Sequence, residues 1–195
     1  MKPLFYLSIL VTCLFANNFD SQDGAPIRQG VHIEWYRTVS PGNPGEVIFT
    51  WSDTRYGMRN IFSHKVNQEG EMIWGSNGAI VTNLPGRQED PVSITDGNGG
   101  VYIAWVDYRF DEEGDIFLQH LDTYGNRMLD DNGIALAQVS GKQITINMCT
   151  DSLGGAFITW QDKRDGIDED IYGTHISSNH ELIAPGAVSY THLRA

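Results

Sequence analysis

The sequence has few cationic residues: its 13 Lys and Arg are outnumbered by 25 Asp and Glu, and the formal net charge is −12 at pH 7. Nucleic acids and anionic membrane surfaces are bound through clustered cations, so this balance disfavours both as partners. Cysteine is scarce as well, with only Cys13 and Cys149. Because Cys13 lies in the N-terminal apolar segment, no disulfide is expected in the rest of the chain. The apolar neighbours of Cys149 favour a buried, unreactive thiol over a nucleophile.

A single long hydrophobic run is present, at the N-terminus. Residues 1–16 (MKPLFYLSILVTCLFA) place Lys2 before an apolar run that is short for a membrane span, which needs roughly 20 residues. We expect a signal peptide cleaved after Ala16, with a lipoprotein signal at Cys13 as the alternative. The predicted location is therefore extracellular, periplasmic or at the cell surface, with no membrane insertion after cleavage. Residues 17–30 are predicted to be a flexible N-terminal segment.

Sustained helical periodicity is also lacking outside residues 1–16. The chain instead contains 21 glycines and many short runs of β-branched and aromatic residues. This combination predicts short strands joined by tight turns, and therefore an all-β fold.

An internal repeat is the main feature of the chain. Three segments carry a Trp-x-Asp-x-Arg motif, and their tryptophans are 54 and 55 residues apart. Further Gly, Gln and Asp positions recur at the same spacing, which indicates duplicated structural units near 45–99, 100–154 and 155–187. The motif residues are Trp51, Asp53, Arg55, Trp105, Asp107, Arg109, Trp160, Asp162 and Arg164.

Each unit contains four strand-like runs, which in the first unit are 47–51, 61–66, 79–82 and 91–95. Four strands in about 54 residues predict a blade of a β-propeller, built as a four-stranded antiparallel sheet. Residues 31–187 are therefore predicted to form an incomplete propeller of about three blades. Residues 31–40 are predicted to be the outer strand of a further blade, and 188–195 to be a non-native or disordered tail.

The strand ending at Trp105 is apolar on both faces, since Val101, Ile103 and Trp105 alternate with Tyr102 and Ala104. A strand covered on both faces lies inside stacked sheets, so the Trp strands are predicted to be buried blade centres. The Gly-Gly pair before each later Trp strand predicts a hairpin turn that requires positive φ.

These repeats resemble the propeller repeats of the Tol-system periplasmic protein and those of large secreted bacterial surface proteins. The resemblance rests on the order of Pro91, Asp96-Gly97, the Trp105 strand and Arg109, followed by the 115–117 strand and then Asp122 and Gly125. It covers residues 45 to about 183 and implies the propeller fold.

A second resemblance is to the Asp-box repeats of sialidases, carried by Thr95-Asp96-Gly97-Asn98-Gly99 and by 150–154. Here the Asp directly follows the Thr, and the Trp falls later than in that family's Ser-x-Asp-x-Gly-x-x-Trp pattern.

Candidate binding residues lie in the loops that follow each Arg, because these loops differ between units whereas the Trp-x-Asp-x-Arg motif recurs and is interpreted as scaffold. The acidic candidates are Asp111, Glu112, Glu113, Asp165 and Asp168. Clustered carboxylates suit Ca²⁺, although the spacing is not that of an EF-hand, and a solvated acidic loop is the favoured interpretation. His120 and His175 occupy equivalent positions and predict no metal site. No catalytic residue is assigned.

The predicted function is a non-catalytic binding or scaffold module of the bacterial envelope or surface, with a protein or carbohydrate ligand. The alternative is a fragment of a secreted glycoside hydrolase or sialidase-like enzyme, in which paired carboxylates would act.

Overall fold

The computed structural model describes residues 26–27 and 34–183. The expected signal peptide (1–16), most of the segment 17–30 and the tail 188–195 lie outside these residues. The described residues form twelve strands. Within them, no helix is long and apolar enough to span a membrane.

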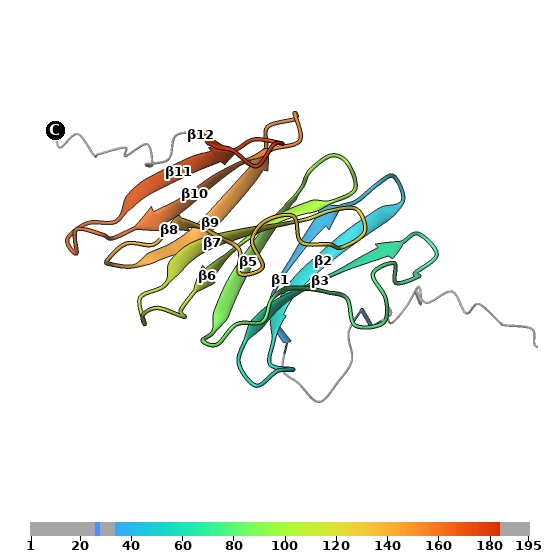
Figure 1. Ribbon diagram of the computed structural model, residues 1–195, viewed down its shortest axis with the longest axis horizontal. Helices are drawn as coiled ribbons and strands as arrows, with labels where there is room; N and C mark the ends of the chain where they lie inside the picture. The colour runs from blue at the N-terminus through green and yellow to red at the C-terminus, as the bar shows by residue number, and fades with distance from the viewer. Residues whose placement is uncertain (1–25, 28–33, 184–195) are drawn as a thin grey trace, which may run out of the picture.

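The twelve strands form three four-stranded antiparallel sheets, which stand side by side like the blades of a fan (Figure 1). The first blade contains β1 (Glu34–Pro41), β2 (Glu46–Asp53), β3 (Asn60–Asn67) and β4 (Ala79–Thr82). The second contains β5 (Gln88–Thr95), β6 (Val101–Asp107), β7 (Asp115–Leu121) and β8 (Ile134–Ala137). The third contains β9 (Gln143–Thr150), β10 (Ala156–Asp162), β11 (Asp170–Ile176) and β12 (Leu182–Ile183). The chain thus has the all-β fold of a partial propeller with about three blades, as the repeat predicts.

The blades begin one strand earlier than the units drawn from the sequence. The run 91–95 was placed last in the first unit, but β5 pairs with the following Trp strand β6. Residues 31–40 were assigned to a further blade, but β1 pairs with β2 in the first blade. The reason is the hairpin at each Gly-Gly turn: it joins the strand before it to the Trp strand after it, so both belong to one sheet.

The Trp strands are the second strands of their sheets, and their tryptophans are buried as predicted, although β10 is buried on one face only and exposes Phe157 and Thr159. Trp51, Trp105 and Trp160 are 4%, 0% and 2% exposed. On β6, Val101, Ile103 and Trp105 pack toward the first blade, and Tyr102 and Ala104 pack toward the third. The second blade therefore contributes to both hydrophobic cores, which explains why its Trp strand is apolar on both faces.

The first strand of each blade contains a bulge that the sequence analysis did not predict. The pairing register shifts after Trp35 in β1 and after Glu89 in β5, and a similar shift occurs where β9 meets β10. At these places Tyr36, Asp90 and Thr145 have positive φ values of 46°, 49° and 57°. Such bulges bend a strand locally and increase its twist. Their recurrence at 54 and 55 residues shows that the bend belongs to the repeat.

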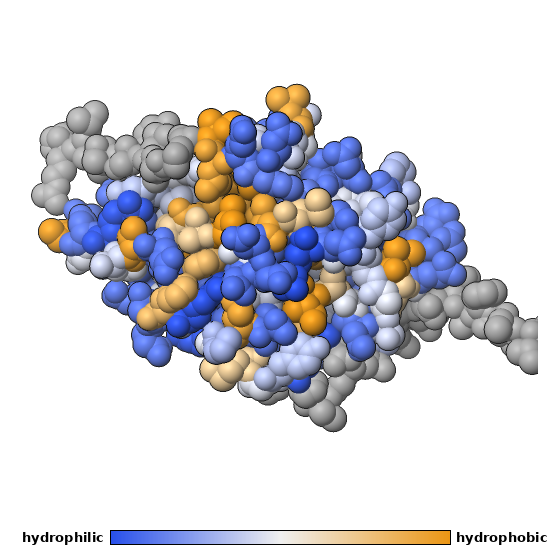
Figure 2. All heavy atoms as spheres, viewed as in Figure 1, coloured by the Kyte–Doolittle hydropathy of each residue, from blue (hydrophilic) through white to orange (hydrophobic). Residues whose placement is uncertain are grey.

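Cys149 is exposed, contrary to the expectation of a buried thiol. It pairs across β9 and β10 with Phe157, which is also exposed, on the face of the third blade that points away from the second. The apolar sequence around Cys149 therefore lies on a half-covered sheet. Figure 2 shows one face of the molecule, which is mostly hydrophilic with separate hydrophobic patches.

Candidate functional site

The Trp-x-Asp-x-Arg motif makes the same contacts in every blade. The indole Nε1 of Trp51, Trp105 and Trp160 donates to the Asp Oδ2 two residues later at 2.9, 2.9 and 3.0 Å. The backbone N–H of each motif Arg donates to Oδ1 of the same Asp at 3.0 Å. All three carboxylates are buried. The motif thus closes the turn at the end of its own Trp strand.

The Arg side chains are held within their own blades as well. The guanidinium groups of Arg55, Arg109 and Arg164 form ion pairs with the motif carboxylates. They also lie 3.7, 4.2 and 3.8 Å from the ring centroids of Phe62, Phe117 and Tyr172. These contacts support the interpretation of the motif as scaffold, because its polar groups are used internally.

The donors around Asp53 and Asp162 lower the pKa values of these two buried carboxylates. Burial by itself raises the pKa of Asp53, but hydrogen bonds from Arg55 and Trp51 lower that pKa below its ordinary value. The same balance, with donors from Arg164 and Trp160, lowers the pKa of Asp162.

The acidic candidates lie in two separate loops, between β6 and β7 and between β10 and β11. Asp111 Oδ1 accepts the N–H groups of Glu113 and Gly114 at 2.8 and 3.0 Å. Asp165 Oδ1 accepts those of Ile167 and Asp168 at 3.0 and 3.3 Å. Among the described residues, no group of three or more His, Cys, Asp or Glu is arranged to hold a metal ion.

The structure brings two of these candidates into one pocket. It has a volume of about 470 Å³ and lies where the β6–β7 loop, the β8–β9 connection and the β10–β11 loop meet. Glu113 and Asp165 belong to its lining. The complete lining is Glu113, Gly141, Lys142, Lys163, Arg164, Asp165 and Gly166.

The sequence analysis missed the two lysines of this pocket. Lys142 directly precedes β9 and Lys163 directly follows β10, and the N–H of Lys163 donates to the carbonyl of Lys142 at 2.8 Å. This backbone bond continues the β9–β10 pairing and holds the two residues side by side. The signal that was available in the sequence is that both positions differ from their counterparts in the second unit, Arg87 and Tyr108.

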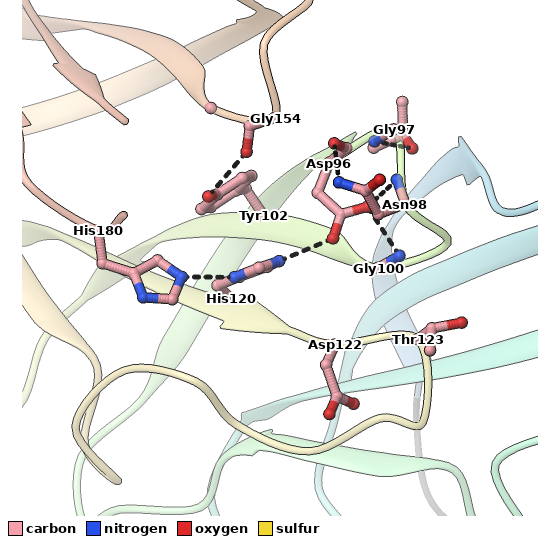
Figure 3. Close-up of polar contacts among 12 residues, drawn as sticks. Asp96, Gly97, Asn98, Gly100, Tyr102, His120, Asp122, Thr123, Gly154 and His180 are labelled. Atoms are coloured by element: carbon pink, nitrogen blue, oxygen red, sulfur yellow. Dashed lines mark hydrogen bonds and ion pairs between the residues drawn. The ribbon is translucent and has the colours of Figure 1, made fainter. Parts of the chain in front are cut away.

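A second polar cluster lies at the opposite end of β6 and joins the second and third blades (Figure 3). His120 Nε2 lies 3.0 Å from Asp96 Oδ2, and His120 Nδ1 lies 2.8 Å from His180 Nε2. Tyr102 stacks on His120 with ring centroids 4.2 Å apart and donates its hydroxyl to the carbonyl of Gly154 at 3.0 Å. Both ring nitrogens of His120 are therefore used inside the protein.

Electrostatics in this cluster follow from burial and from these contacts. Burial raises the pKa of Asp96, but hydrogen bonds from His120 and from the N–H groups of Asn98 and Gly100 bring it below its ordinary value. Burial, and then the charge of His120, lowers the pKa of His180. Burial, with the charges of Asp96 and Asp151, raises the pKa of Tyr102 to about 12.

His180 occupies a position that is glycine in the earlier blades. Gly70, Gly125 and His180 recur at 55-residue spacing, with φ values of 78°, 84° and 64°. A left-handed backbone is unfavourable for a residue with a side chain, so this position carries local strain. The strained turn points the imidazole toward the second blade.

The Asp–His pair recurs in the third blade, where His175 Nε2 lies 2.8 Å from Asp151 Oδ2. In the first blade Lys65 stands at the histidine position and pairs with Glu46 at 3.2 Å. Repetition of an acid–base pair at this place in each blade favours a role in holding the turn over a role in catalysis.

The acid is supplied from two different positions. Glu46 aligns with Gly100, and Gly42 aligns with Asp96. A Cβ at Gly100 would lie 2.4 Å from both Asp96 Oδ2 and the backbone carbonyl of Leu121, and a Cβ at Gly42 would lie 2.9 Å from the Cβ of Glu46. The acid thus favours glycine at whichever of the two positions does not carry it, and at Gly100 the Leu121 carbonyl adds to this requirement.

Solved structures share this fold. The chain is similar to the endo-arabinase from Bacteroides thetaiotaomicron VPI-5482, with a TM-score of 0.53 and 16% identity over 83% of this chain and 62% of that one. It is also similar to an N-acetylgalactosamine deacetylase from F. plautii in complex with blood group B trisaccharide. There the TM-score is 0.51 and the identity 6%, over 86% of this chain and 56% of that one.

These identities show the fold alone, and the chain spans less than two thirds of either protein. Neither protein-family models nor curated protein sequences match the chain.

Proposed function

We propose that this chain is part of an exported bacterial β-propeller protein that binds carbohydrate at the pocket between the second and third blades. The observation that carries the proposal is that pocket, where the loops that differ between blades converge. Its volume of about 470 Å³ is in the range of small-ligand sites. Its charged side chains offer both donors and acceptors, which the hydroxyl groups of a sugar require.

Fold similarity supports carbohydrate rather than protein as the ligand. Two solved structures with this fold are an endo-arabinase and a deacetylase in complex with a trisaccharide. Export is supported by residues 1–16, which have the composition of a signal peptide.

Binding is favoured over catalysis by the state of the two pocket carboxylates. Glu113 Oε2 accepts the N–H of Gly141 at 3.2 Å, and Asp165 Oδ1 accepts two N–H groups of its own loop. Carboxylates that act on a glycosidic bond need access to the leaving oxygen and to a water or the sugar ring. The second candidate is a fragment of a carbohydrate-active enzyme, which the similarity to the endo-arabinase and the deacetylase favours.

The two candidates are separated by measuring binding and bond cleavage on the same polysaccharides. We expect the chain to migrate more slowly in an affinity gel that contains a polysaccharide to which it binds. We expect no release of reducing sugars from that polysaccharide. Glu113→Gln should weaken the retardation. The matched control is Glu112→Gln, because Glu112 is 96% exposed and lies outside the pocket lining. Release of reducing sugars would favour the enzyme, and no retardation by any polysaccharide would refute the proposal.

A further inference from the structure

The charge of the pocket is unusual for this chain. The described residues contain three lysines, of which Lys65 is buried and paired with Glu46. The other two, Lys142 and Lys163, both line the pocket. In a protein of net charge −12, these two cations are concentrated at one place.

Neither of these ammonium groups is neutralised by another described residue. The equivalent cation in the second blade, Arg87, lies 3.6 Å from both Glu89 and Glu112 and stacks on Tyr108 at 3.9 Å. Thus the second blade uses its cation internally.

The third blade has lost each of those partners. Counting 55 residues on, Ile144 replaces Glu89, Ile167 replaces Glu112 and Lys163 replaces Tyr108. Two acids become isoleucines and the aromatic ring becomes a second cation. The second blade thus has one paired cation at Arg87, whereas the third has two cations at the equivalent pair of positions, and neither forms an ion pair with a described residue.

The acids that remain in the pocket keep their charge, but no ion pair joins Glu113 or Asp165 to either lysine among the described residues. Glu113 and Asp165 are engaged by backbone N–H groups, as described above, and Arg164 is paired with Asp162 beneath the pocket. Two lysines held side by side by a backbone hydrogen bond form a suitable receptor for a carboxylate or a sulfate, since each ammonium group offers three donors.

We propose that Lys142 and Lys163 bind an anionic group of the glycan, the carboxylate of a uronic acid or a sulfate ester, so that the pocket selects acidic polysaccharides. This inference rests on the proposed function and adds the class of ligand to it.

The test compares polygalacturonate with its fully methyl-esterified form, which has the same sugars without the charge. Binding to the whole chain is measured by calorimetry at about 0.15 M salt, where long-range repulsion from the acidic protein is screened. We expect tighter binding of polygalacturonate. Lys142→Gln and Lys163→Gln should each weaken it about tenfold, equivalent to about 1.4 kcal/mol. Dextran and dextran sulfate form a second matched pair, which distinguishes sulfate from carboxylate.

Two further variants use the comparison between blades. Ile167→Glu restores the acid that pairs with Arg87 in the second blade, at a residue that is 74% exposed, and should weaken polygalacturonate binding without disturbing the core. Arg87→Gln removes the equivalent cation of the second blade and should leave the binding unchanged.

Each outcome decides one of the two proposals. Preference for the charged member of either pair, lost in the lysine variants and retained in Arg87→Gln, supports the anionic ligand. Equal binding of charged and uncharged forms, unaffected by Lys142→Gln and Lys163→Gln, overturns this inference and leaves the proposed function standing. Absence of binding to every polysaccharide refutes the proposed function and this inference with it.

Discussion

Replacing Asp115 by asparagine should stabilise the protein at neutral pH. Asn60 Nδ2 of the first blade donates to Gln88 Oε1 of the second at 2.7 Å. Asp115 of the second blade and Gln143 of the third are the equivalent pair, and Asp115 Oδ2 and Gln143 Oε1 are both buried without a hydrogen-bond partner among the described residues. Two acceptors thus stand where Asn60 and Gln88 supply a donor and an acceptor. Asp115→Asn supplies the missing donor.

The magnitude follows from the displaced pKa of Asp115. Burial, together with the nearby charges of Asp111 and Asp107, raises this pKa from 3.8 to about 6. That displacement corresponds to at most about 3 kcal/mol, and an unsatisfied buried polar group costs about 1–3 kcal/mol. Because the pKa is raised on folding, the stabilising effect of the bound proton is complete below about pH 4 and is lost as the pH rises through about 6.

The assay is urea unfolding followed by tryptophan fluorescence at two pH values. At about pH 7.5 we expect Asp115→Asn to raise the free energy of unfolding by about 1–3 kcal/mol, and at about pH 4.5 to change it by less than about 1 kcal/mol. The reverse change, Asn60→Asp, should lower the stability of the first blade, more at the higher pH. A variant no more stable than the parent at pH 7.5, or a gain that is the same at both pH values, would refute the reasoning.

Three further variants test the fold. Thr145→Gly should raise the melting temperature and increase the free energy of unfolding by about 1 kcal/mol, because the β-branched Thr145 has a φ of 57°. A lower melting temperature would contradict the inference that the backbone is strained at this residue. Trp105→Ala should cost about 3–5 kcal/mol in chemical unfolding, because the indole is fully buried between the first two blades, and a loss below about 1 kcal/mol would contradict that packing. Gly100→Ala should destabilise by more than about 1 kcal/mol, because its Cβ would lie 2.4 Å from both Asp96 Oδ2 and the Leu121 carbonyl. Asp96→Gly in the same chain removes the first of these contacts and should recover part of the loss, and failure to do so would leave the Leu121 carbonyl as the cause.

Much of the fold could be predicted because the repeat is visible in the residues that the blades need most. Trp105 and its alternating apolar neighbours identify a strand buried on both faces, and the recurring glycines identify the turns. The blade boundary was misplaced because spacing shows the length of a repeat and not where a sheet begins. The hairpin at Gly99-Gly100 already implied that the strand before it pairs with the strand after it.

The candidate site was only partly predictable. Glu113 and Asp165 were singled out because the loops differ between units, but they are 52 residues apart and only the packing of the second and third blades brings them together. Lys142 was missed because a single surface lysine has no sequence signature. Its significance depends on Ile144 and Ile167, which stand where the second blade has acids.

The acid of the blade turn occupies different positions in the first and second blades, and this difference indicates how the sequences of repeated blades can diverge. The first blade carries its acid at Glu46 with glycine at Gly42, and the second carries it at Asp96 with glycine at Gly100. If the two positions change one at a time, the intermediate turn contains either two crowded acids or no acid. Either intermediate should be less stable, so we expect the two positions to change together. In a sequence alignment of the blades, the two positions would show two unrelated replacements. In the structure, the two arrangements place one negative charge at the same point of the turn.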